Sequence, residues 1–174
     1  RNTRAGREVL LDTLVWAGHD EAQAALVELI DSETTRKDEH VAGFVQRLSF
    51  VQQPNLQTLA YVEKQAFAGT GRFEPSALYA LGSAASNARK QAGGETAERG
   101  DVIVGRLASA LQAASEPDRQ RHLLSSLGNA AAIEHENLIV SFAAADDPGV
   151  RSHVASSLRA NPSALARATL LNLS

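Results

Sequence analysis

Apolar residues recur along this chain at spacings of three and four, which place them on one face of an α-helix. The pattern is clearest between residues 123 and 159. Three stripes follow one another there: Leu123, Leu124, Leu127 and Ala130; then Leu138, Ile139 and Phe142; then Val150, Val154 and Leu158. Each stripe predicts a short amphipathic helix, and the segments between the stripes predict tight turns.

The same arrangement returns elsewhere in the sequence, which indicates an internal repeat. When residues 10–30 are laid on residues 123–143, six positions are identical and most other core positions are apolar in both. Five leucines at equivalent places lie 34, 33, 46 and 31 residues apart: Leu14, Leu48, Leu81, Leu127 and Leu158. This period is typical of helical hairpins that stack and bury one another's faces. The sequence therefore predicts one all-α domain over residues 1–174, an α-solenoid of about five helical hairpins.

Proline positions agree with this division. Proline lacks the backbone N–H that a helix interior needs, but it is tolerated in the first turn. All five prolines fall where a helix is expected to begin: Pro54, Pro75, Pro117, Pro148 and Pro162. Ser115 and Asp118 have the spacing of a capping box, and Asn161 is expected to open the last helix in the same way.

Polar segments interrupt the stripes at three places. Residues 31–39 predict a loop, and residues 69–74 predict a glycine-rich turn. Residues 91–100 contain Gly93 and Gly94 and predict a mobile loop that lengthens one repeat.

Six residues are expected to serve turns, caps or close packing. They are Gly82, Gly128, Asn129, Asp147, Pro148 and Arg151. Asp147 can cap the helix that Pro148 begins. Arg151, four residues further on, can fold back onto the carboxylate of Asp147.

Composition narrows the class of protein. Aromatic residues make up 5% of the 174 residues, cysteine is absent, and the formal net charge is −3. The basic residues are dispersed, so neither nucleic acid nor an anionic membrane is expected as a partner. No apolar run is long enough for a transmembrane segment. The chain starts at Arg1, and its last stripe ends in apolar residues without a polar capping helix, so we expect a piece of a longer protein.

The sequence does not predict a catalytic or metal site. Metal binding would need histidines that converge with carboxylates, and the five histidines lack ligand spacing: His19, His40, His122, His135 and His153. The serine pairs lack a nucleophile elbow, and the glycine pairs lack the lysine of a phosphate-binding loop. We therefore expect neither an enzyme nor a bound metal or cofactor.

Four residues are candidates for contact with a partner. Trp16, the only tryptophan, is expected to pack against the neighbouring hairpin, and an exposed anchor is the alternative. Glu28, Glu63 and Ser141 would line a polar groove if the protein binds a peptide.

The order of the motifs resembles a known family. The motifs are LLDTLVWAG, Gln53-Pro54, Ala80-Leu81-Gly82-Ser83, Leu127-Gly128-Asn129-Ala130, and Val150-Arg151 followed by Leu158-Arg159. Their order resembles the superhelical region of large lipid transfer proteins, the vitellogenin N-terminal family. The resemblance implies a right-handed double layer of helices that supports a lipid cavity, in a secreted or extracytoplasmic protein. The cysteines common in that family and its cavity-lining strands have no counterpart in this sequence.

These observations lead to one main hypothesis and two alternatives. The main hypothesis is a non-catalytic HEAT-like scaffold that docks a partner or a neighbouring domain, as the helical support of a lipid-binding protein. The first alternative is a stand-alone adaptor that binds a protein or peptide, which a polar groove would favour. The second is a HEAT-like enzyme acting on nucleic-acid bases, which the net charge of −3 and the few aromatic residues disfavour.

Overall fold

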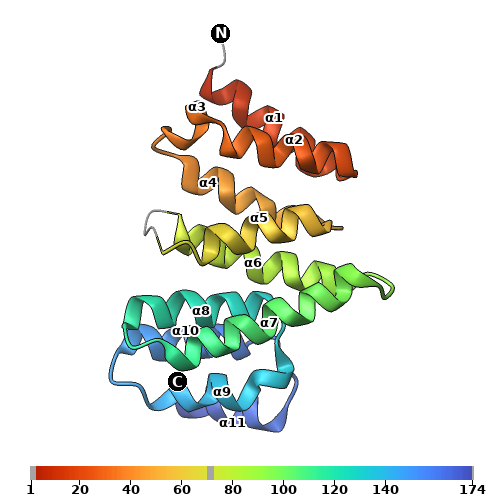
Figure 1. Cartoon of the computed structure of the whole chain (residues 1–174). Helices are drawn as coiled ribbons and strands as arrows, with labels where there is room; N and C mark the ends of the chain where they lie inside the picture. Colours follow the sequence, from red (N-terminus) through yellow and green to blue (C-terminus); the bar gives the residue numbers. More distant parts are fainter. Residues whose placement is uncertain (1–2, 70–72, 174) are drawn as a thin grey trace.

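The computed structural model describes residues 3–69 and 73–173, and every regular element within these residues is a helix. The helices run broadly in sequence order down the long dimension of the molecule, except that α10 lies beside α8 and ahead of α9 (Figure 1). The α-helices are α1 Arg4–Ala17, α2 Asp20–Asp31, α3 Glu33–Arg36, α4 Val41–Gln46, α5 Leu56–Ala66, α6 Glu74–Arg89, α7 Glu95–Ala113, α8 Pro117–Asn129, α9 Glu136–Ser141, α10 Pro148–Leu158 and α11 Ala164–Leu173. Three 3₁₀-helices accompany them: η1 Arg47–Phe50, η2 Ile133–His135 and η3 Phe142–Ala144. The predicted all-α class is confirmed.

Contacts between helices arrange them in two rows. In the first row α1 packs on η1, the short α4–η1 unit packs on α6, α6 on α8, and α8 on α10. In the second row α2 packs on α5 and α5 on α7, while α9 and α11 contact each other near the C-terminal end. All five equivalent leucines lie in the first row, which we call the leucine row: Leu14, Leu48, Leu81, Leu127 and Leu158.

Small side chains allow the centre of the molecule to pack tightly. The helix α6 contacts α4, η1, α5, α7 and α8, and among its residues only Tyr79 is exposed. Five of its alanines are fully buried: Ala77, Ala80, Ala84, Ala85 and Ala88. Because alanine fills little space and favours helix, α6 can approach several neighbours at once.

Two glycines set the spacing of α6, α8 and α10. A Cβ at Gly82 would collide with the backbone oxygen of Ser126, and a Cβ at Gly128 would lie 2.8 Å from the Cα of Ser157. The hydroxyls of these serines donate hydrogen bonds of 2.7 Å to carbonyl oxygens of the preceding helix. Gly82 therefore lies inside α6 at a helix contact, and not at a turn.

A buried amide joins the first repeat to the second. The side chain of Gln23 is only 2% exposed. Its Nε2 donates to the carbonyl oxygens of Gly18 and Gln53, and its Oε1 accepts from the Asn55 N–H and the Thr58 hydroxyl, at 2.7 to 3.0 Å. Both donors and both acceptor sites of the amide are thus used, so its burial leaves no polar group unpaired.

The helix starts differ from the expectations in part. Asp147 caps α10 as predicted, because its Oδ1 accepts from the Val150 N–H at 2.8 Å. The predicted pairing of Arg151 with Asp147 is wrong: Arg151 donates to the carbonyl oxygens of Ala145 and Asp146, and Arg121 lies 3.6 Å from the Asp147 carboxylate.

The predicted capping boxes are also corrected. Glu116 is the N-cap of α8 and makes no side-chain capping bond, so Ser115 does not cap that helix. At the last helix the Ser163 hydroxyl accepts from the Ala166 N–H at 2.9 Å, which is the capping role expected of Asn161.

The prolines lie at helix entrances, but at two different places. Three are the first or second residue of a helix: Pro75, Pro117 and Pro148. Pro54 and Pro162 stand two residues before the first residue of α5 and α11.

The polar segments are more helical than predicted. The expected loop at residues 31–39 contains the short helix α3. The loop predicted at residues 91–100 ends at Gly94, because α7 begins at Glu95. Gly93 and Gly94 both have positive φ, which allows a tight turn and a short connection between α6 and α7. The turn predicted at residues 69–74 lies partly outside the described residues.

Candidate interaction site

The C-terminal ends of α1 and η1 form a hollow of about 340 Å³, which we call the aromatic hollow. It is lined by Val15, Trp16, Ala17, Gly18, His19, Phe50, Gln52 and Gln53. Gly18 ends α1 in the left-handed conformation, with φ 66°, and its N–H bonds to the carbonyl oxygen of Leu14. His19 then caps α2 through its ring nitrogen. These two caps fix the side of the hollow that the α1–α2 connection forms.

Two large aromatic side chains stand exposed in the aromatic hollow. Trp16 is 86% exposed and Phe50 is 60% exposed, so the expectation that Trp16 packs against the next hairpin is wrong. The buried residues of α1 are Arg7, Leu11 and Val15. Trp16 follows Val15 and is therefore turned about 100° away from the packed face.

A second hollow, of about 270 Å³, lies among α6, α8 and α10, and we call it the polar hollow. Its lining residues are Tyr79, Ser125, Gly128, Asn129, Ser156, Ser157, Arg159 and Ala160, none of which is acidic. Asn129 donates one bond, at 3.5 Å, to the carbonyl oxygen of Tyr79, which is too long to occupy the amide fully. Arg159 is exposed and forms no ion pair with the described residues. The hollow thus offers one cation and several neutral hydrogen-bonding groups.

The three candidates for a polar groove lie on different helices. Glu28 is exposed on α2, and Ser141 is exposed on α9, where its hydroxyl donates to the carbonyl oxygen of Leu138. Glu63 on α5 is only 4% exposed. Its carboxylate pairs with Arg99 and Arg106 of α7, so it joins two helices of the second row.

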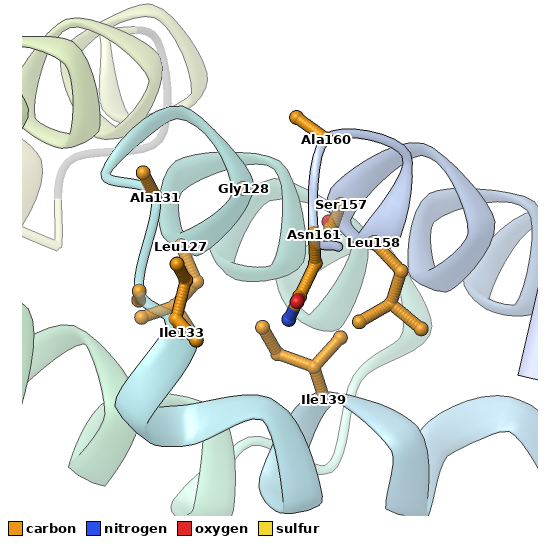
Figure 2. Close-up of a pocket in the computed structure, with 10 residues that line it drawn as sticks. Leu127, Gly128, Ala131, Ile133, Ile139, Ser157, Leu158, Ala160 and Asn161 are labelled. Carbon is orange, nitrogen blue, oxygen red and sulfur yellow. The ribbon is translucent and has the colours of Figure 1, made fainter. Parts of the chain in front are cut away.

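A small apolar cavity lies near the C-terminal end of the molecule. Figure 2 shows Leu127, Ile133, Ile139 and Leu158 extending toward it from α8, η2, α9 and α10. Its volume is about 50 Å³, whereas pockets for small-molecule ligands measure about 300 to 1,000 Å³. This cavity is too small for a lipid chain.

Several titratable groups gather around His122 on α8. Glu74, Glu116, Asp118 and Arg119 line a hollow with it, and Arg119 pairs with Glu74. Burial lowers the pKa of His122, and His153 and Arg121 add to this shift while Glu74 opposes it. Within the described part of the chain, no three His, Asp or Glu side chains are placed to hold a metal ion. Nor is any helix there both long and apolar enough to cross a membrane.

Comparison with known proteins assigns no family to this chain. No protein-family model matches it, and no curated protein matches it with significance. The resemblance to the lipid transfer proteins therefore stays a prediction.

Sequence reasoning identified Trp16 but missed Phe50, Tyr79 and Arg159. For Phe50 and Tyr79 the signal lay in the repeat register, whereas Arg159 directly follows Leu158 and stands outside this register. Trp16 and Phe50 each stand two residues after an equivalent leucine, Leu14 and Leu48. Such a position points away from the leucine, by about 160° on the α-helix α1 and by about 120° on the 3₁₀-helix η1.

Proposed function

We propose that the chain is a non-catalytic helical-repeat scaffold whose leucine row docks a partner protein or a neighbouring domain. The observation that supports this most is the exposed pair of Trp16 and Phe50 in one hollow. Tryptophan is enriched among the residues that contribute most to binding at protein interfaces. Full burial of a large apolar side chain contributes about 1.5 to 3 kcal/mol. A partner that covers both rings gains a corresponding stabilisation.

The scaffold in this proposal is a right-handed superhelix of about five HEAT-like hairpins. Polar contacts between successive repeats support it, because they join residues about one repeat apart in sequence. Asp12 pairs with Arg47 and Gln23 bonds to Thr58, each over 35 residues, and Glu63 pairs with Arg99 over 36 residues. Separations of about one repeat length are expected when repeats stack in one direction, and the longer span of 43 residues from Glu63 to Arg106 falls in the lengthened repeat.

A role in lipid carriage, in this proposal, belongs to a longer protein. The apolar cavity of about 50 Å³ leaves no room for an acyl chain. The helices would then support a lipid-binding domain that docks on the leucine row, as the resemblance to the vitellogenin N-terminal family implies.

Capture of partners from an extract tests the docking function, with the chain immobilised and three variants compared. Trp16→Ala and Phe50→Ala should each lose the proteins that the unchanged chain captures. Leu171→Ala should keep them, because Leu171 is a 77% exposed apolar residue on α11, outside the aromatic hollow. Equal capture by all variants would contradict the proposal. Lipid-mass adducts in native mass spectrometry of the isolated chain would favour direct lipid binding instead.

A further inference from the structure

The outward side of the leucine row is made of equivalent positions from all five repeats. On an α-helix, residues two before and two after a given leucine lie about 160° from it in either direction. On the 3₁₀-helix η1 the offset of Phe50 from Leu48 is about 120°, and Ala160 follows the end of α10. These positions therefore point away from the leucines. Two residues before stand Asp12, Gln46, Tyr79, Ser125 and Ser156; two residues after stand Trp16, Phe50, Ser83, Asn129 and Ala160. None of these ten side chains is buried. The aromatic and polar hollows are therefore two parts of one surface, which we call the outward face.

The chemistry of the outward face changes along the row. Its N-terminal end presents Trp16 and Phe50 around a hollow lined by apolar and neutral side chains and His19. Its C-terminal end presents hydroxyls, the Asn129 amide and the guanidinium of Arg159, with no acidic group in the lining. Asp12, the one carboxylate among the ten positions, lies at the aromatic end and is paired with Arg47. An occupant of this face meets apolar rings at one end and a cation at the other.

We infer that the outward face binds an extended peptide segment of a partner protein, apolar at one end and acidic at the other. This inference rests on the proposed docking function and names the partner's chemistry. The apolar side chains cover Trp16 and Phe50, and a carboxylate of the segment pairs with Arg159. Asn129 donates and accepts hydrogen bonds with one peptide unit between the two ends, which an amide side chain can do at once.

The dimensions of the row set the length of the segment. Packed helices lie about 8 to 10 Å apart, so the four steps from α1 to α10 span roughly 32 to 40 Å. An extended chain covers about 3.3 Å per residue. The segment therefore needs about 10 to 12 residues between the apolar anchor and the carboxylate.

A random peptide library displayed on phage tests this inference when selected against the whole chain. Library members need about 16 residues, so that both ends of the face can be reached. Selected peptides should share an apolar residue in one half and Asp or Glu in the other. The affinity of fluorescein-labelled synthetic copies is then measured by anisotropy. Trp16→Ala and Arg159→Glu should each weaken binding at least about tenfold, as expected for a lost ring contact or a lost charge-assisted bond.

Two control variants keep the comparison specific. Leu171→Ala removes an exposed apolar residue and Arg167→Glu reverses an exposed charge, both on α11 outside the outward face. Both should bind within about twofold of the unchanged chain, since neither touches the peptide. A second selection against Arg159→Glu should replace the acidic residue of the consensus with Lys or Arg.

The outcomes separate this inference from the docking function on which it rests. Peptides whose affinity falls with Trp16→Ala but does not change with Arg159→Glu would overturn the inference of an extended acidic segment. Docking at the aromatic hollow would still stand. Recovery of no binding peptide would also overturn the inference. The proposed docking function would be contradicted only by a further result. Trp16→Ala and Phe50→Ala would have to capture the same proteins from the extract as the unchanged chain.

Discussion

Between α6, α8 and α10 the helices of the leucine row meet backbone to backbone, whereas the first two repeats are joined through side chains. The close contacts need Gly82 and Gly128, where a Cβ would meet backbone atoms of the next helix. The first junction depends on the Gln23 amide and on the pairs Arg7 with Asp38 and Arg47 with Asp12. The two glycine junctions depend on the absence of a side chain, whereas the first junction depends on long polar and charged side chains.

The difference has a consequence for the surface. Where the backbones are in close contact, the outward face is lined by small and polar groups such as Ser125 and Ser156, together with Tyr79 and Arg159. At the first junction the helices leave room for Trp16 and Phe50 to stand exposed. The side-chain junction thus presents the apolar anchor, and the glycine junctions present the polar end.

Substitution of Gly82 should have the largest effect on stability. Gly82→Ala places a Cβ against the backbone oxygen of Ser126 and forces α6 and α8 apart, so we expect a loss of about 3 kcal/mol in the free energy of unfolding. Urea unfolding followed by circular dichroism measures it. Gly105→Ala is the matched control, because nothing lies within 4 Å of its Cβ position. The control should gain about 0.5 to 1 kcal/mol from helix propensity; equal effects at both sites would contradict the packing role of Gly82.

Removal of the buried amide should have the next largest effect, toward the N-terminal end of the molecule. Gln23→Ala removes the hydrogen-bond partner of the Thr58 hydroxyl and of backbone groups of Gly18, Gln53 and Asn55. We expect a loss of about 2 to 3 kcal/mol. Hydrogen exchange should show faster exchange in α1 and α2 and little change in α8 and α10. Uniformly faster exchange along the chain would argue against two distinct kinds of junction.

Neutralisation of Glu63 should have a smaller effect. Glu63→Gln keeps the shape of the side chain but weakens its bonds to Arg99 and Arg106, which remain partly hydrated. We expect a loss of about 1 to 2 kcal/mol, measured by chemical denaturation. Glu33→Gln serves as a control, since its pair with Lys37 is exposed and should contribute less than about 0.5 kcal/mol. If Glu63→Gln left the free energy of unfolding unchanged, the ion pairs of Glu63 would not stabilise the contact of α5 with α7.

Titration of His122 should have the smallest effect. Because burial lowers its pKa below 6.5, the folded chain binds this proton less readily than the unfolded chain. The fold therefore has its full stability above pH 6.5, where His122 is neutral. It loses part of that stability as the pH falls through the pKa of His122 in the folded chain. His122→Gln should reduce the loss of stability between about pH 7.5 and 5 in urea titrations. If the variant and the unchanged chain lost stability equally over this pH range, protonation of His122 would not be the cause.

Much of the fold could be predicted because stripe spacing and leucine register are local properties of the sequence. The stripe at Val150, Val154 and Leu158 became α10 with all three side chains buried. The role of Gly82 could not be predicted, because sequence alone does not distinguish a glycine in a turn from one at a helix contact. The burial of Gln23 was hidden for a similar reason, since its partners lie about 30 to 35 residues away.

Parts of the candidate site were also within reach of the sequence. The position of Trp16, two residues after Leu14, indicated exposure once the leucine register was known. The start of α7 was missed because Gly93 and Gly94 resemble the middle of a loop, whereas they form its last turn. Arg159 was treated only as part of a motif, and its lack of an ion partner among the described residues is a property of the fold.

Quenching of Trp16 fluorescence by acrylamide tests the central claim most directly, because the chain has a single tryptophan. The exposed side chain in the aromatic hollow predicts quenching in the native protein nearly as strong as in denaturant, with little change in the emission maximum. Strong protection of the native indole, with blue-shifted emission, would show that Trp16 is packed and would contradict the account of the docking surface.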